Sequence, residues 1–247
     1  MSPSRTRLDQ LLVERGLAPS REKARALIMA GAVATGTQRL LKPGVMVALD
    51  LPVSLEAAPR FVGRGGDKLE RALTTFKLDV TGMTALDAGA STGGFTDCLL
   101  QHGASQVYAV DVGHGQLDYR LRRDPRVVCL EGVNIRNGLS LPTLCDMATI
   151  DVSFISLELI VPPVVRALRP GAPIVALIKP QFEVGKGKVG KGGVVKEPAL
   201  HLEVLSRILR WGIDQGLRLG GLTGARHPDR RPAGGPRLRD LAYLRLG

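Results

Sequence analysis

Two lysines and one aspartate are the residues best suited to carry out chemistry in this chain. Asp151 and Lys179 each follow an apolar run, and Lys68 lies in the helix-like segment GRGGDKLERAL. Neighbouring cations and partial burial lower the pKa of a lysine, so that it can act as a base near neutral pH. If the three side chains converge, they could activate a hydroxyl that is a poor nucleophile on its own, such as a ribose 2′-hydroxyl.

Each of these residues also has an ordinary structural explanation. Lys68 could be a surface lysine of a helix, Lys179 could simply end a strand, and Asp151 could cap a helix. For any one of them alone, the structural explanation is the better one. Their joint placement at the ends of elements favours a site.

The elements that must position these residues alternate between strands and helices. Apolar runs such as TALDA, SQVYAVD and APIVALI are separated by helix-like segments, which predicts a doubly wound, mostly parallel Rossmann-like α/β domain. Ligands bind such sheets at the carboxyl ends of the strands. Asp87, Asp111, Asp151 and Lys179 all fall at predicted strand ends, which is the main argument that they are site residues.

A glycine-rich segment, LDAGASTGGFTDCLL, predicts a strand, a tight loop and a helix that together bind a cofactor. Asp111 ends the next strand and could accept hydrogen bonds from ribose hydroxyls. The spacing of Gly89, Gly93 and Gly94 differs from G-x-G-x-x-G, so it favours S-adenosylmethionine over NAD, with a purely structural turn as a third option. The candidate cofactor contacts are Asp87, Gly89, Ser91, Gly93, Gly94, Phe95, Asp111, Asn134 and Asp151.

The net charge of +11 and the pI near 10.1 indicate a polyanionic partner, either nucleic acid or an anionic membrane surface. Residues 1–60 hold nine Lys and Arg against five Asp and Glu, and residues 215–247 hold seven arginines against two aspartates. A third basic stretch, residues 183–196, contains five glycines and four lysines. It is either a flexible linker or a basic lid that orders on RNA.

Several classes of protein are disfavoured by composition. No stretch reaches the ~18 apolar residues that span a bilayer, and no apolar region follows the charged start as in a secretory signal. The three cysteines are widely spaced and do not cluster with the four histidines, so neither a disulfide framework nor a metal site is expected. A reducing, cytoplasmic setting fits best.

Residues 1–58 predict a small α+β module. Leu8, Leu11 and Leu12 share one helical face, Ser20 is a suitable N-cap for a second helix, and two short strands should form a hairpin. A solvated charged face is the plain explanation for the basic residues of the second helix. We expect a linker at residues 59–66, where Pro59 and several glycines interrupt helices, and a second domain at residues 67–247.

The string RLDQLLVERGLAPSREKARALIMAGAVATG resembles the S4-like RNA-binding domain, with Thr35-Gly36 in place of its usual Asn-Gly. The segments RGGDKLERAL, LDAGASTGGFTDCLL, DVSFISL and ALIKPQFEVG resemble the TlyA family across nearly the whole chain. These are FtsJ-like ribosomal RNA 2′-O-methyltransferases, also known as hemolysin A proteins. The resemblance implies S-adenosylmethionine as cofactor and cytidines of ribosomal RNA, or of ribosomal subunits, as substrate.

The same resemblance implies a catalytic Lys-Asp-Lys-Glu tetrad. Lys68, Asp151 and Lys179 match its first three members, with a lysine assisting deprotonation and Asp151 orienting it and lining the cofactor site. Asp240 stands where the glutamate is expected, and its shorter side chain reaches less far. The S4-like resemblance implies that Arg21, Lys23 and Arg25 contact RNA phosphates. The further candidate RNA contacts are Arg5, Arg7, Lys42, Arg64, Lys186 and Lys188.

Three other functions remain open from the sequence. A decayed site around Asp240 would leave an RNA-binding protein without activity. A membrane-active cytolysin would match the hemolysin name, although no spanning segment or long membrane-surface helix is present. An NAD-dependent enzyme is the last alternative.

Overall fold

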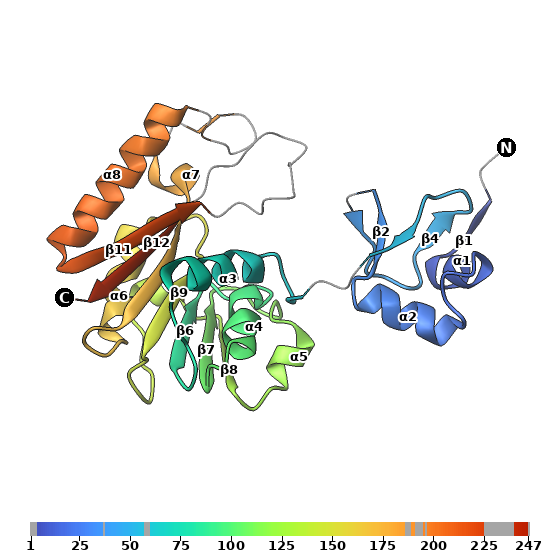
Figure 1. Cartoon of the computed structure of the whole chain (residues 1–247), viewed down its shortest axis with the longest axis horizontal. Helices are drawn as coiled ribbons and strands as arrows, with labels where there is room; N and C mark the ends of the chain where they lie inside the picture. The colour runs from blue at the N-terminus through green and yellow to red at the C-terminus, as the bar shows by residue number, and fades with distance from the viewer. Residues whose placement is uncertain are drawn as a thin grey trace. The chain divides into compact units, whose positions relative to one another are not determined.

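A computed structural model describes residues 4–36, 38–56, 60–185, 189–190, 195, 197–224 and 240–246. The chain divides into two compact units, Met1–Arg60 and Phe61–Gly247, which we call the N-terminal and C-terminal units. Each has its own hydrophobic core (Figure 1). The predicted linker at residues 59–66 spans this division, and Phe61 is buried in the core of the C-terminal unit.

The described part of the N-terminal unit contains two short helices and five short strands. Its elements are β1 (Arg5–Arg7), α1 (Leu8–Glu14), α2 (Arg21–Met29), β2 (Val33–Thr35), β3 (Gln38–Arg39), β4 (Met46–Ala48) and β5 (Ser54–Leu55). The predicted N-cap is confirmed, since the Ser20 side chain accepts a hydrogen bond from the backbone N–H of Lys23. Leu8, Leu11 and Leu12 are buried, as their spacing on one helical face predicts.

The two strands that we expected to form one hairpin belong to different sheets. β2 pairs with β3 and β5, whereas β4 pairs with β1 in antiparallel register. The hairpin prediction was wrong because it considered only neighbouring segments. β1 is three residues long and polar, so no periodicity marks it as a strand.

A buried carboxylate organises the start of this unit. Asp9 is fully buried in α1, and its two side-chain oxygens accept hydrogen bonds from Arg7 at 3.0 and 2.9 Å. Arg21 of α2 reaches the same carboxylate at 3.4 Å. The hydrogen bond from Arg7 is the main cause that lowers the pKa of Asp9 to about 2.

Loss of the Asp9 charge should destabilise the N-terminal unit in a pH-dependent way. Because its pKa is lowered, ionised Asp9 stabilises the fold above the unfolded value of ~4, and this stabilisation is lost as the pH falls towards 2. We expect Asp9→Asn to lower the free energy of unfolding by about 1–2 kcal/mol at pH 7, and by less at pH 3. Urea unfolding followed by circular dichroism measures the difference.

The single tryptophan, Trp211, lies in the C-terminal unit and provides the control. Its fluorescence transition should be the same in the wild type and in Asp9→Asn. An equal loss of stability at both pH values would contradict the role given to the Asp9 charge.

The C-terminal unit is built on one seven-stranded sheet (Figure 1). Its strands are β6 (Thr84–Ala88), β7 (Gln106–Asp111), β8 (Val127–Glu131), β9 (Met147–Ile150), β10 (Pro173–Ile178), β11 (Leu217–Gly224) and β12 (Asp240–Leu246). Its helices are α3 (Gly65–Phe76), α4 (Gly94–Gln101), α5 (Tyr119–Arg122), η1 (Ile135–Asn137), α6 (Leu157–Arg166), α7 (Pro180–Glu183) and α8 (Pro198–Asp214).

The strand order is β11-β12-β10-β9-β6-β7-β8. The five strands from β10 to β8 run parallel, and β12 pairs antiparallel with both β10 and β11. The chain moves outward from β6 in one direction through β7 and β8, and then returns to β9 on the other side. This switch point between β6 and β9 is where an open α/β sheet binds its ligands.

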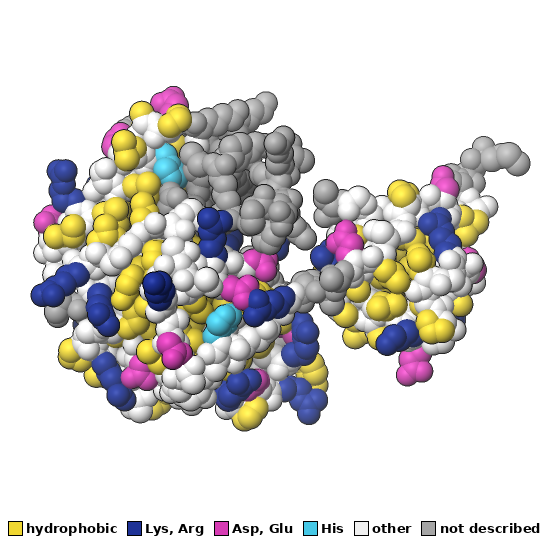
Figure 2. Space-filling view, in the orientation of Figure 1, with side chains coloured by type: hydrophobic (Ala, Val, Ile, Leu, Met, Phe, Trp, Pro, Cys, Tyr) yellow, Lys and Arg dark blue, Asp and Glu magenta, His cyan; other side chains and the backbone are white. Residues whose placement is uncertain are grey.

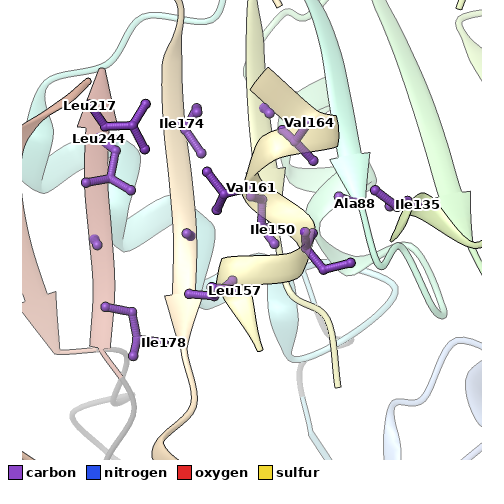
Figure 3. Packing of buried hydrophobic residues seen from close by; sticks show 14 of the residues in the cluster. Ala88, Ile135, Ile150, Leu157, Val161, Val164, Ile174, Ile178, Leu217 and Leu244 are labelled. Atoms are coloured by element: carbon purple, nitrogen blue, oxygen red, sulfur yellow. The ribbon is translucent and has the colours of Figure 1, made fainter. Parts of the chain in front are cut away.

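Helices cover both faces of the sheet, and the central strands β6, β7, β9 and β10 are mostly buried, whereas β8 is partly buried and β11 is mostly exposed. One core contains residues of α6 and α8, including Leu157, Val161 and Val164, packed against Ile150 and Ile174 of the sheet (Figure 3). The other core contains residues of α3 and α4 on the opposite face. The predicted fold class, a mostly parallel α/β domain behind a small α+β module, is confirmed.

Among the described residues, none of the helices combines the length and the apolar character that a membrane span requires.

Candidate active site

The carboxylate of Asp151 lies between two lysine side chains. Lys179 Nζ is 2.5 Å from its Oδ1 and Lys68 Nζ is 3.8 Å from its Oδ2. The sheet brings Asp151 and Lys179 together, because they follow the carboxyl ends of β9 and β10, which are parallel neighbours. The three residues that the sequence singled out for chemistry are therefore brought together at one edge of the sheet.

The amino group of Lys179 is surrounded by oxygen atoms of the protein. Lys179 is only 6% exposed and follows β10 directly, at the N-cap of α7. Besides its ion pair with the Asp151 carboxylate, it donates hydrogen bonds to the carbonyl of Val152 at 2.7 Å and to Ser153 Oγ at 3.0 Å. With the carbonyl of Asp151 at 3.4 Å, at least four oxygen atoms lie within hydrogen-bonding or ion-pairing distance of Lys179 Nζ.

Lys68 approaches from α3 and is more open. Its side chain is 19% exposed, compared with 7% for Lys179. The start of α3 packs tightly, since a Cβ at Gly66 would lie 2.3 Å from Phe61 Cγ. That close approach fixes the helix end from which Lys68 extends.

The glycine-rich loop between β6 and α4 lies beside this cluster. Gly89 has φ +88°, and a Cβ there would lie 2.9 Å from the carbonyl oxygen of Asp151. Gly93 has φ +94°, and a Cβ there would lie 2.2 Å from Leu121 Cδ1. Both positions therefore need glycine, and Gly89 brings the loop against the backbone of Asp151.

The remaining candidates around this loop lie as follows. Asp111, at the end of β7, accepts hydrogen bonds from the backbone N–H groups of Ser91 and Gly113, each at 2.8 Å. A carboxylate has about four acceptor positions, so Asp111 retains capacity for a ligand. Asn134 is exposed at the N-cap of η1. Gly94 and the buried Phe95 begin α4.

Asp87 faces the interior of the protein. It is fully buried, and its oxygens accept hydrogen bonds from Thr96 Oγ1 at 2.7 Å and Thr149 Oγ1 at 3.0 Å. Burial is the main cause that raises its pKa to about 6. These two hydrogen bonds connect β6 to α4 and to β9. They therefore hold the glycine-rich loop, which lies between β6 and α4, against the strand that ends just before Asp151.

Asp240 begins β12, and its backbone pairs with Ile178, the residue before Lys179. Its side chain lies outside the described residues, as do Lys186 and Lys188. Of the other candidate RNA contacts, Arg5, Lys23, Arg25, Lys42 and Arg64 are exposed, whereas Arg7 and Arg21 contact Asp9.

Phe154 is a further candidate site residue that sequence reasoning missed. It lies three residues after Asp151, is 90% exposed, and has φ +64°, which is rare for a bulky residue. Its ring centroid is 4.9 Å from that of Phe182 in α7. The segment DVSFISL contained the residue, but no periodicity distinguishes an exposed phenylalanine from a buried one.

No group of three or more His, Cys, Asp or Glu side chains that could hold a metal ion occurs among the described residues.

The strand order, the switch point and the glycine-rich loop together define a methyltransferase-like α/β domain. Residues 61–228 match the FtsJ-like methyltransferase family, and residues 6–50 match the S4 domain. The chain therefore belongs to the FtsJ-like methyltransferase family and carries an S4 domain before its methyltransferase domain.

Three similar proteins align with most of this chain. YqxC of Bacillus subtilis is 49% identical over 227 residues, which are 90% of this chain and 81% of YqxC. The 16S/23S rRNA (cytidine-2′-O)-methyltransferase TlyA of Mycobacterium tuberculosis is 44% identical over 229 residues, 91% of this chain and 85% of TlyA. A solved structure from Streptococcus thermophilus, of a protein that carries the name hemolysin, has a TM-score of 0.73 at 41% identity, covering 98% of this chain and 88% of that one.

The buried Asp87 should make stability fall as the pH rises. Because its pKa is raised to about 6, the folded state holds a proton that the unfolded state releases near pH 4. Asp87→Asn stays neutral, so its free energy of unfolding relative to the wild type should rise by about 2–3 kcal/mol between pH 4 and pH 7. Denaturant unfolding followed by Trp211 fluorescence measures this.

Asp214→Asn, at an exposed position of α8, is the matched control and should show no such change. A difference between Asp87→Asn and the wild type that is constant with pH would contradict the assignment.

Proposed function

We propose that this chain is an S-adenosylmethionine-dependent methyltransferase that modifies the 2′-hydroxyl of cytidines in ribosomal RNA. The observation that carries the proposal is the Asp151 carboxylate between Lys68 and Lys179, beside the glycine-rich loop. The 44% identity to the TlyA rRNA (cytidine-2′-O)-methyltransferase supports the substrate class.

The residues around the loop suit S-adenosylmethionine. The loop approaches closely at two glycines with positive φ, and it ends at the N-terminus of α4, where backbone N–H groups favour a carboxylate. Asp111 retains acceptor positions for ribose hydroxyls. We propose that the cofactor site is lined by Gly89, Ser91, Gly93, Gly94, Phe95, Asp111, Asn134 and Asp151. Asp87 supports this site indirectly, because its buried carboxylate holds the glycine-rich loop through Thr96 and Thr149.

The proposed chemistry divides the work between the two lysines. Bound S-adenosylmethionine supplies a methyl group on a positively charged sulfur. Lys179, whose protons all have acceptors, stabilises the charge of Asp151 and fixes its orientation. Lys68 is the more accessible lysine, and as the free amine it would accept the proton of the 2′-hydroxyl. The 2′-oxygen would bond to the methyl carbon in line as the bond from that carbon to sulfur breaks, so that a neutral thioether leaves. We propose Asp240 as the fourth member of this set.

Phe154 offers an exposed aromatic face three residues after Asp151. Unstacked bases of RNA stack on exposed aromatic side chains. The exposed ring of Phe154 is suited to support the base of the target nucleotide in this way.

We further propose that residues 1–58 dock RNA, that residues 59–66 link the domains, and that residues 67–247 transfer the methyl group. Figure 2 shows Lys and Arg side chains spread over the displayed face of each unit with Asp and Glu among them, so docking would use many separate contacts to phosphates. The candidates are Arg5, Arg7, Arg21, Lys23, Arg25, Lys42, Arg64, Lys186 and Lys188. Ribosomal RNA or subunits in the cytoplasm would be the partner.

Removal of either lysine should abolish most activity. Lys68→Met and Lys179→Met keep the aliphatic stem but lose the charge, so methyl transfer should fall by about 100-fold or more. The measurement is transfer of labelled methyl from S-adenosylmethionine to ribosomal RNA and to ribosomal subunits. Lys77→Ala, at the exposed end of α3, is the control.

Unchanged activity in both lysine variants would overturn the proposed mechanism. Cofactor binding without transfer to any ribosomal RNA would favour an RNA-binding protein with a decayed site. A thermal-shift comparison of NAD with S-adenosylmethionine tests the cofactor independently.

RNA affinity should depend on the exposed cations of α2. Lys23→Ala combined with Arg25→Ala should weaken RNA binding at all sequences, and the slope of log affinity against log salt should fall by about 2. Binding titrations at several salt concentrations measure it, with Arg210→Ala of α8 as the control. A slope equal to that of the wild type would show that α2 does not contact phosphates.

A further inference from the structure

Glu183 is a buried carboxylate that the proposed mechanism does not use. It ends α7, four residues after Lys179, and is 8% exposed. Its Oε2 accepts a hydrogen bond from Ser156 Oγ at 2.7 Å, and its Oε1 accepts one from the backbone N–H of Leu157 at 2.9 Å. These two groups form the N-terminus of α6, where the Ser156 side chain is the N-cap.

The same short segment therefore holds the loop after β9 at both ends. We call residues 151–157 the aromatic loop, because they include Phe154. Lys179 binds its beginning through the Asp151 carboxylate and the Val152 carbonyl, and Glu183 binds its end. Both contacts come from residues 179–183, which contain only α7 and its N-cap.

Phe154 lies between these two points of attachment. Its left-handed φ of +64° and its 90% exposure are both unfavourable for a bulky apolar residue. A backbone in that state persists only when its surroundings determine it. The contact of its ring with Phe182 again comes from α7.

Glu183 is itself held from α8. Arg207 donates a hydrogen bond to the Glu183 carbonyl at 2.8 Å and lies 3.4 Å from Oε2, and it pairs with Glu158 of α6 at 2.9 Å. Burial raises the pKa of Glu183, against the hydrogen bonds from Leu157 and Ser156 and the charge of Arg207. The Glu183 carboxylate is therefore fixed from both α6 and α8.

We propose that Glu183 is a positioning residue for methyl transfer, which fixes the aromatic loop so that the Asp151 carboxylate and the Phe154 ring keep their orientation. The inference rests on the proposed function, because the groups it positions are those of the proposed site. Glu183 acts through Ser156 and Leu157 and does not touch the reacting atoms. A displacement of about 1 Å in such a site costs about 100-fold in rate.

The kinetic test compares Glu183→Ala and Ser156→Ala with the wild type. We expect kcat to fall by about 10-fold to 100-fold, because orientation is lost while the RNA and cofactor contacts remain. KM for RNA and for S-adenosylmethionine should stay within about twofold. Ser156→Thr keeps the hydroxyl and should keep the activity, and Glu203→Ala, at an exposed position of α8, is the matched control.

Hydrogen exchange of peptides covering the aromatic loop gives a readout that needs no activity. The loop amides, Leu157 above all, should exchange faster in Glu183→Ala and in Ser156→Ala than in Glu203→Ala. Unchanged exchange overturns the proposal, and so does faster exchange with unchanged kcat or with a change in KM alone. If the wild type methylates no RNA, the proposed function fails, and exchange still decides whether Glu183 holds the loop.

Discussion

The ion pair between Asp151 and the buried ammonium of Lys179 is the contact on which the proposed site depends. Burial of two charges costs several kcal/mol per ion unless each finds close partners. Lys179 meets this condition with the Val152 carbonyl and Ser153 Oγ as well as Asp151. Parallel pairing of β9 and β10 ends both strands at one edge, so the fold itself brings the two charges together.

Other parts of the C-terminal unit are arranged around this pair. The glycine-rich loop touches the Asp151 backbone at Gly89, and the buried Asp87 ties that loop to β9 through Thr149. α3 adds Lys68 on the open side, and α7 holds the loop beyond Asp151. The glycine-rich loop and Lys68 are thus held in fixed positions by the same sheet and its helices. Methyl transfer between a bound cofactor and a bound RNA requires such fixed positions.

Much of this could be predicted from the sequence, because apolar runs and turn residues act locally. The strands that carry Asp151 and Lys179, the loop glycines and the Ser20 cap were all predicted from neighbouring residues. Three features were not predictable in this way. α5 and α7 have only four residues each and lack a periodic pattern, the pairing of β1 with β4 joins distant segments, and the direction of the Asp87 side chain depends on Thr96 and Thr149.

Mapping of ribose methylation tests the central claim most directly. Ribosomal RNA that lacks the modification would be incubated with S-adenosylmethionine and either wild-type protein or Asp151→Asn, and each nucleotide would be analysed by mass spectrometry. The account predicts 2′-O-methylcytidine with the wild type and almost none with Asp151→Asn, although that variant still binds RNA. Equal methylation by both proteins would contradict it.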